Sequence, residues 1–201
     1  MLKRLSEITN TDAQFDSIVI VDPEDGTIRS MCVDDHYAAL EAIELCPHVS
    51  PAVRVVFERA RNAFLYAWFA HDLTAVAESQ AYAALEMALR GHLGGGAKSR
   101  VLRGIGEQLH AVYMTGALDD FPLPQHEGTS DRKTYFDQLN ALIRRSRNHL
   151  AHGTEYIGTP GAVLDSLHLC ASLINHLYQK SRNPARNKDT STDKLLRNFY
   201  F

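Results

Sequence analysis

A helical spacing of apolar residues, repeated in several stretches of the chain, is the feature that most limits its fold. From Pro51 onward, apolar side chains recur at positions i, i+3, i+4 and i+7, which places them on one face of an α-helix. The first stripe consists of Val53, Val56, Phe57, Ala60, Phe64, Ala67 and Trp68. This pattern predicts a long core helix, and a content of 45% hydrophobic residues in a chain of 201 is enough to build a core around it.

Glycine and proline residues separate the helical stretches that follow. A second helix is expected from about Thr74 to the Gly94-Gly95-Gly96 run, and it should pack against the first as a helical hairpin. A third, weaker helix is expected over residues 98–113, before an irregular loop at Phe121-Pro122-Leu123-Pro124. The last core helix should follow the Gly158-Thr159-Pro160-Gly161 turn.

A further helix, expected between the third and the last, begins after a predicted cap at Thr129-Ser130-Asp131. Its apolar stripe consists of Tyr135, Leu139, Leu142, Ile143, Ser146 and Leu150. Gly153 stands where a left-handed residue often ends a helix. We therefore expect the residues around position 150 to form a helix end.

The first fifty residues follow a different pattern. Two β-prone segments, residues 17–21 and 27–33, flank the turn-forming run 22–26, which indicates a hairpin, and Asp34-Asp35 should cap a short helix that ends by Leu45. The predicted fold class is mostly all-α, an antiparallel helical bundle of four to five core helices with a small N-terminal hairpin and helix lobe. We expect an accessory lobe at 1–48, a helical domain at 51–180 and a basic, flexible tail at 181–201.

Charge and composition limit the ligands and the location. Residues 1–50 carry ten acidic and three basic side chains, so the total of −3 leaves about +4 for residues 51–201, which should attract a polyanion. Neither a secretory signal nor a membrane span is recognisable, and the three cysteines are unpaired in pattern, so a cytoplasmic protein without membrane contact is expected. The ten histidines show no metal-ligand spacing, so no metal or other cofactor is expected.

The segment from Leu142 to Gly153, LIRRSRNHLAHG, resembles the signature of the HEPN family (higher eukaryotes and prokaryotes nucleotide-binding), in which an Arg precedes a His by several residues at a helix end. The run from Ala81 to Arg90, AYAALEMALR, is similar to the family's glutamate-bearing second helix. The resemblance covers about residues 51–180. It implies a HEPN-like bundle, metal-independent RNA cleavage, perhaps in a toxin or phage-defence effector, and a homodimer.

Two side chains of this motif suit the chemistry of RNA cleavage. His152 can act as general base or acid, because imidazole titrates near neutral pH, and Arg147 can stabilise charge on the phosphate. The expected supporting residues are Asn148, His149, Arg144, Arg145 and Glu86. Five residues advance about 500° around a helix, so Arg147 and His152 lie about 140° apart. The helix must therefore fray, or two subunits must form one composite site, and the family resemblance implies the second arrangement.

Plainer interpretations of the same residues stay open. Arg147 can be a solvated cation and His152 a helix cap, His149 is expected to pack structurally, and Glu86 can either pair with Arg90 on its own helix or anchor Arg147. The main alternative function is a non-catalytic HEPN module that binds RNA, a nucleotide or a protein partner such as an antitoxin or regulatory protein. A plain helical scaffold without a ligand is the third.

Overall fold

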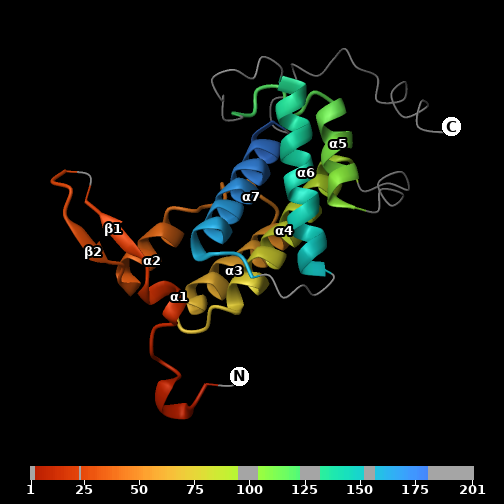
Figure 1. The fold of residues 1–201 in the computed structure, drawn as a ribbon. Coiled ribbons are helices and arrows are strands. Elements are labelled where there is room, and N and C mark those ends of the chain that lie inside the picture. The colour runs from red at the N-terminus through yellow and green to blue at the C-terminus, as the bar shows by residue number, and fades with distance from the viewer. Residues whose placement is uncertain (1–2, 23, 95–103, 123–131, 152–156, 181–201) are drawn as a thin grey trace.

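The computed structural model describes residues 3–22, 24–94, 104–122, 132–151 and 157–180. Within these ranges the chain forms seven α-helices, one short 3-10 helix and one two-stranded sheet (Figure 1). In chain order the elements are η1 (Leu5–Glu7), α1 (Ala13–Asp16), β1 (Val19–Val21), β2 (Ile28–Ser30), α2 (Val33–Glu41), α3 (Pro51–Ala67), α4 (Leu73–His92), α5 (Ile105–Met114), α6 (Arg132–Ala151) and α7 (Pro160–Lys180). The predicted mostly helical class is confirmed, together with the small hairpin.

Helix α4 lies at the centre of the bundle and packs along α3 and α7, with α5 and α6 also against it. Small side chains let the neighbouring backbones approach α4 closely, since Ala77, Ala81, Ala84 and Ala88 are all buried on it. Leu85 and Leu89 complete its buried face. The predicted hairpin of the first two long helices is confirmed by the packing of α3 against α4.

Helices α5 and α6 pack against each other at one end of the bundle (Figure 1). The rings of Tyr113 on α5 and Phe136 on α6 stack, with their centroids 3.9 Å apart, and Ile143 on α6 is fully buried. Gly106 on α5 leaves room for Arg144 of α6, because an added Cβ would lie 2.1 Å from the Arg144 Cδ. One face of α6 therefore belongs to the core and the other is left to solvent.

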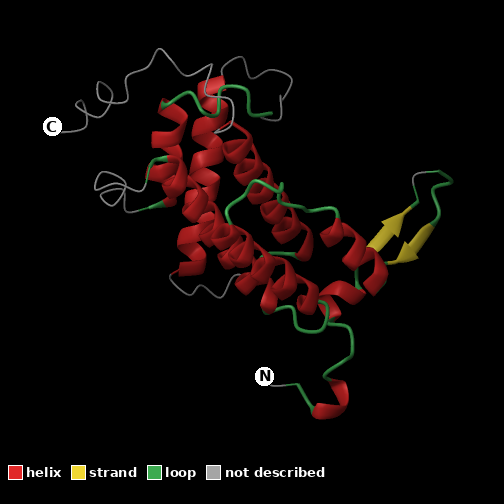
Figure 2. Ribbon diagram, turned by 180° about the vertical axis from the view of Figure 1, so that it is seen from behind, coloured by secondary structure: helices red, strands yellow, loops and turns green. Residues whose placement is uncertain are grey.

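The N-terminal elements join the bundle through a small second core. Phe15 and Trp68 are buried there, and His36 lies among their rings and that of Phe64. The His36 Nε2–H donates to the carbonyl oxygen of Phe64 over 2.9 Å, and burial lowers the pKa of His36 below its ordinary value of 6.5. The hairpin itself stands away from the helices (Figure 2).

Two side chains of α7 attach the chain between α2 and α3, Asn175 and Tyr178, whose hydroxyl donates to Ser50 Oγ over 3.0 Å. Asn175 accepts a hydrogen bond from the Cys46 backbone N–H over 2.7 Å and donates one to the Glu44 carbonyl over 2.8 Å. Arg54 of α3 donates to the Cys46 carbonyl over 2.8 Å. These bonds satisfy backbone groups that a longer α2 would otherwise have paired within itself.

Several details differ from the sequence-based expectations. Helix α2 ends at Glu41 and not at Leu45, because the Leu40 and Leu45 carbonyls accept hydrogen bonds from Arg61 and Arg54 of α3. Leu142 was expected in the apolar stripe, yet its side chain is 57% exposed, since it lies about 100° around the helix from buried Ile143. His149 is exposed and not packed.

Some expectations fall outside the described residues. These are the predicted cap at 129–131, the end of the fourth predicted helix at Gly153, the start of the third predicted helix and the tail at 181–201. Across the described ranges, every helix is too short or too polar to cross a bilayer.

Candidate functional site

A cleft of about 130 Å³ lies between α4 and the C-terminal half of α6. Helix α4 lines it with Ser79, Tyr82, Ala83 and Glu86, which share one face because they follow the spacing i, i+3, i+4, i+7. Helix α6 adds Arg147 and Leu150. A cleft of this volume accommodates a phosphate-sized group.

An ion pair between the two helices forms one side of the cleft. The Arg147 Nε–H donates to Glu86 Oε1 over 3.0 Å, joining residues 61 positions apart in the chain. The Arg147 side chain is 41% exposed and that of Glu86 is 15% exposed. The pair therefore orients a guanidinium group that remains partly in contact with solvent, as recognition of an oxyanion requires.

A buried carboxylate, that of Glu78, lies one turn before Tyr82 on α4. Glu78, which is 9% exposed, accepts a hydrogen bond from Ser166 Oγ of α7 over 2.8 Å and one from the Tyr82 hydroxyl over 3.3 Å. Burial raises the pKa of Tyr82, so its hydroxyl stays neutral. Tyr82 also lines the cleft, so the network connects the cleft to α7.

The segment that leads into α7 rests against the same network. The His71 Nε2–H donates to the Gly158 carbonyl oxygen over 3.1 Å. A Cβ added to Gly158 would lie 3.0 Å from Val163 Cγ2 and 3.9 Å from Glu78 Oε2, so the backbone passes close to both side chains. Gly158 is thereby held beside Glu78.

Of the predicted site residues, Glu86 and Arg147 are brought together. Arg144 extends over Gly106 of α5, and Arg145, Asn148 and His149 are exposed. His152 lies outside the described residues, so its predicted role stays a prediction. The alternative pairing of Glu86 with Arg90 is absent among the described residues, where Glu86 pairs with Arg147 instead.

Sequence reasoning missed Glu78, Tyr82, Ser79 and Ser166. Besides its alanine and leucine stripe, α4 carries a second, polar series at positions 78, 79, 82 and 86, which the sequence-based prediction did not use. Polar residues repeated at helical spacing beside an apolar stripe indicate a helix that faces both a core and a polar cleft. This signal could have identified three of the four.

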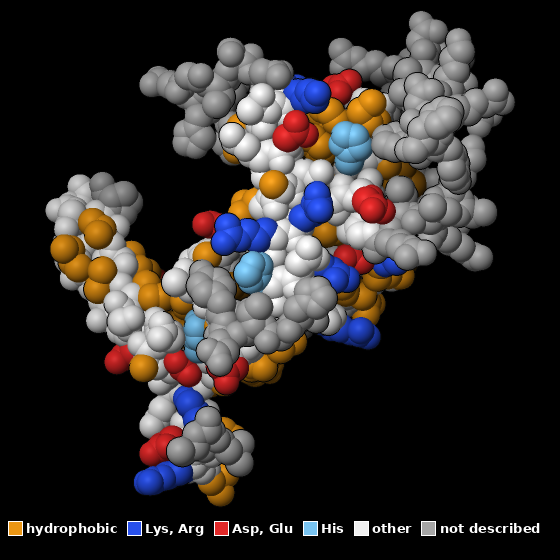
Figure 3. Space-filling view, turned by 45° about the vertical axis from the view of Figure 1, so that its right-hand side comes forward, with side chains coloured by type: hydrophobic (Ala, Val, Ile, Leu, Met, Phe, Trp, Pro, Cys, Tyr) orange, Lys and Arg blue, Asp and Glu red, His pale blue; other side chains and the backbone are white. Residues whose placement is uncertain are grey.

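The electrostatics of α6 favour an anionic ligand. The helix carries Arg132, Lys133, Arg144, Arg145 and Arg147 against the single acidic residue Asp137. Figure 3 shows basic side chains spread over the helical body of the molecule and hydrophobic ones on the projecting arm. Within the described ranges, no three His, Cys, Asp or Glu side chains are close enough together to hold a metal ion.

Comparisons of this chain with protein-family models, with curated proteins and with solved structures give no match.

Proposed function

We propose that this chain is a HEPN-type, metal-independent endoribonuclease whose scissile phosphate binds at the cleft between α4 and α6. The observation that carries the proposal is the ion pair between Glu86 and Arg147, which holds a partly exposed guanidinium at the rim of a phosphate-sized cleft. A guanidinium that is oriented by a mostly buried carboxylate presents its remaining N–H donors in a fixed geometry, which suits the recognition of a phosphate.

The proposed chemistry uses groups of this chain alone. A general base takes the proton of the ribose 2′-hydroxyl, the 2′-oxygen attacks the adjacent phosphorus, and a general acid protonates the departing 5′-oxygen. The products are a 2′,3′-cyclic phosphate and a 5′-hydroxyl. Arg147 donates hydrogen bonds to the non-bridging oxygens as their charge grows, and His152 is proposed as the base or the acid.

The proposal includes a homodimer. On a regular helix Arg147 and His152 lie about 140° apart, so one subunit presents them in different directions. A two-fold axis that brings two α6 ends together would place Arg147 of one copy beside His152 of the other. Such a protein suits a toxin or defence effector that acts on cellular RNA and is restrained by a protein partner.

The test is cleavage of total RNA by purified protein in excess EDTA. We expect wild-type activity to persist, to leave 2′,3′-cyclic phosphate ends, and to fall at least about a hundredfold in Arg147→Ala and His152→Ala. Glu86→Gln keeps the side-chain size but loses the charge that orients Arg147, so an intermediate loss is expected. Arg59→Ala, which removes an exposed arginine from α3, is the matched control and should cleave like wild type. Loss of activity in EDTA, or 3′-hydroxyl products, would exclude the proposed mechanism.

One observation favours a second candidate, a HEPN module that binds RNA without cutting it. Glu86 already neutralises part of the charge of Arg147, which reduces the stabilisation that the guanidinium offers to a phosphorane. In the same experiment, this candidate predicts salt-dependent RNA binding that Arg147→Ala weakens, with no cleavage in any variant.

A further inference from the structure

The β-hairpin carries an apolar face that the chain itself leaves exposed. Val21 pairs with Ile28 across the ladder and Val19 with Ser30, so these four side chains lie on one face of the ribbon. Val19, Val21 and Ile28 are 59%, 57% and 67% exposed. Because two isolated strands are marginally stable in water, a hairpin of this kind gains most from a partner that covers its apolar face.

The turn of the hairpin is acidic. Asp22 Oδ1 accepts from the Glu24 backbone N–H and Asp25 Oδ1 from the Thr27 backbone N–H, both over 2.8 Å. Hydrogen bonding by the Thr27 side chain, and by its backbone N–H, lowers the pKa of Asp25. With Glu24, the turn thus presents three carboxylates next to the apolar face.

The outer face of α6 also combines an apolar side chain with charged ones, but its charge is positive. Leu142, Arg145 and His149 follow the spacing i, i+3, i+7, and all three are exposed. Leu142 is the one large apolar side chain that α6 exposes prominently within the described residues, and Arg145 is one turn away from it. The α6 face, with Leu142 beside a positive charge, is therefore complementary to the hairpin, whose apolar face lies beside negative charges.

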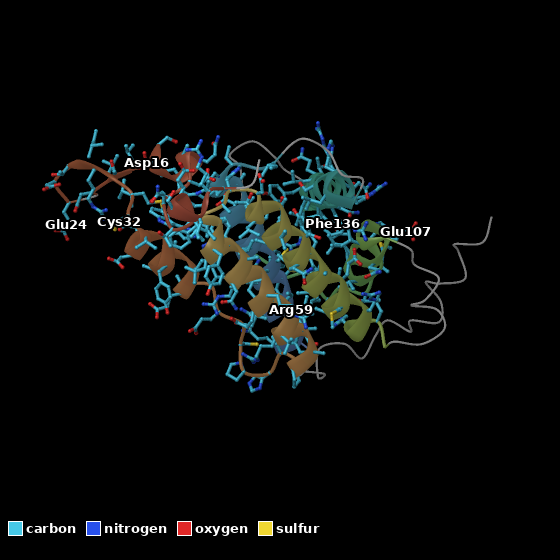
Figure 4. All side chains as sticks on the ribbon, turned by 90° about the horizontal axis from the view of Figure 1, so that it is seen from below. Asp16, Glu24, Cys32, Arg59, Glu107 and Phe136 are labelled. Atoms are coloured by element: carbon cyan, nitrogen blue, oxygen red, sulfur yellow. The ribbon has the colours of Figure 1, made fainter. Side chains whose placement is uncertain are left out.

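The two surfaces cannot meet within one chain. The hairpin projects from one end of the molecule, and α6 lies on the far side of α4 and α7 from it (Figure 1). The view from below agrees, with Glu24 of the hairpin at one end and Phe136 of α6 towards the other (Figure 4). A contact between these surfaces therefore needs a second copy of the chain.

We propose that the arm, defined as residues 19–22 and 24–30, docks on the outer face of α6, defined as Leu142, Arg145 and His149, of a second copy of the chain. A two-fold axis makes the exchange reciprocal, so each dimer contains two such contacts and buries twice the area of one. Because the arm and α6 lie far apart within each chain, this contact holds the two α6 ends apart. It is therefore a dimer contact separate from the composite site, and the inference goes beyond the proposed function.

Sedimentation equilibrium of the full chain without RNA tests the arm directly. At about 0.05 M salt we expect a species near twice 22.5 kDa, and at about 1 M salt weaker association, because screening acts on exposed charges. The triple variant Asp22→Asn, Glu24→Gln, Asp25→Asn keeps the side-chain oxygens that cap the turn but removes three charges. Its dimer dissociation constant should rise by about tenfold or more. The matched control Glu41→Gln, Glu44→Gln neutralises exposed acids elsewhere in the lobe and should dimerise like wild type.

A charge exchange identifies the partner surface. Glu24→Arg and Arg145→Glu should each weaken the dimer, and combining them in one chain should restore part of the affinity, since the exchanged pair again carries opposite charges. Ile28→Thr, which keeps a β-branched residue in the strand, should weaken it through the lost apolar contact. Circular dichroism of each variant verifies that the helices are intact.

A wild-type monomer at low salt overturns the arm proposal, and so does a dimer unaffected by the arm variants or a charge exchange without recovery. RNA cleavage by the same samples separates the two proposals. A dimer that behaves as expected but never cleaves RNA in EDTA keeps the arm and refutes the nuclease. If the protein cleaves RNA but the arm variants do not change its association, the nuclease proposal stands and the arm proposal is refuted.

Discussion

Replacement of Glu78 by alanine should destabilise the protein through the loss of one buried acceptor. Its Oε1 accepts hydrogen bonds from the Ser166 and Tyr82 hydroxyls, and Tyr82 is 3% exposed. Ser166 Oγ can still donate to the Ala162 carbonyl, 3.1 Å away, so it keeps a partner. The Tyr82 hydroxyl retains a long contact of 3.5 Å to Ser166 Oγ and hydrogen bonding with the Ser146 side chain. The cost therefore falls mainly on the weakened hydrogen bonding of Tyr82.

The expected magnitude follows from these contacts. A buried hydroxyl that loses its acceptor costs about 1–3 kcal/mol, and removal of the side-chain methylene group adds about 0.8 kcal/mol. Relief of the desolvation of a buried carboxylate offsets part of this cost. We expect Glu78→Ala to lower the free energy of unfolding by about 2 kcal/mol. Glu78→Gln keeps the methylene groups and an acceptor oxygen, so its loss should be less than half as large.

Urea unfolding of wild type, Glu78→Ala, Glu78→Gln, Ser166→Ala and the Glu78→Ala, Ser166→Ala double variant measures these effects, provided that the m-value is constant. The double-mutant cycle should show a coupling energy of about 1 kcal/mol, because the two side chains are bonded. Losses that add within about 0.3 kcal/mol would contradict the hydrogen bond between them. If alanine and glutamine cost the same, the acceptor oxygen is not the source of the stability.

Three further predictions concern other parts of the molecule. The pKa of His36 is lower in the folded protein than in the unfolded chain, so the unfolded chain binds a proton at His36 more readily. The contribution of His36 to the free energy of unfolding should therefore be complete above about pH 6.5 and should fall as the pH drops below that value. His36→Gln should reduce this slope in denaturant titrations between about pH 5 and 7, while His92, whose pKa burial also lowers, maintains the remainder. Asn175→Ala should cost about 1–2 kcal/mol in urea unfolding, since it removes the bonds to Cys46 and Glu44, and a cost near zero would show that the loop does not need them. Gly106→Ala alone should not stabilise the protein, because the added Cβ meets Arg144. In the Arg144→Ala background the same change should stabilise it by about 0.5 kcal/mol through helix propensity, and so raise the thermal midpoint. An equal effect of Gly106→Ala in both backgrounds would contradict this packing.

Local patterns were sufficient to predict most of the secondary structure. The stripe from Val53 to Trp68 predicted α3, and the turn residues at 22–26 predicted the hairpin, because spacing and turn chemistry act over a few neighbours. The spacing predicted less accurately which side chains of α6 are buried. Ile143 and Leu142 are adjacent and similarly apolar, yet one is fully buried and the other exposed, since 100° of helix rotation separates them.

The sequence by itself determined the helical class, the acidic lobe beside a basic bundle, and Arg147 as a candidate, since each depends on composition or on spacing within one helix. Only the tertiary structure decided the partner of Glu86. Arg90, one turn along the same helix, and Arg147, 61 positions away, both offered a guanidinium, and the packing of α6 against α4 brings the second one to the carboxylate. Glu78, Tyr82 and Ser166 likewise meet only because α4 and α7 pack together. Helical spacing specifies which side of a helix is apolar, but the pairing of polar groups depends on where whole helices dock, and that depends on the packing of all their side chains.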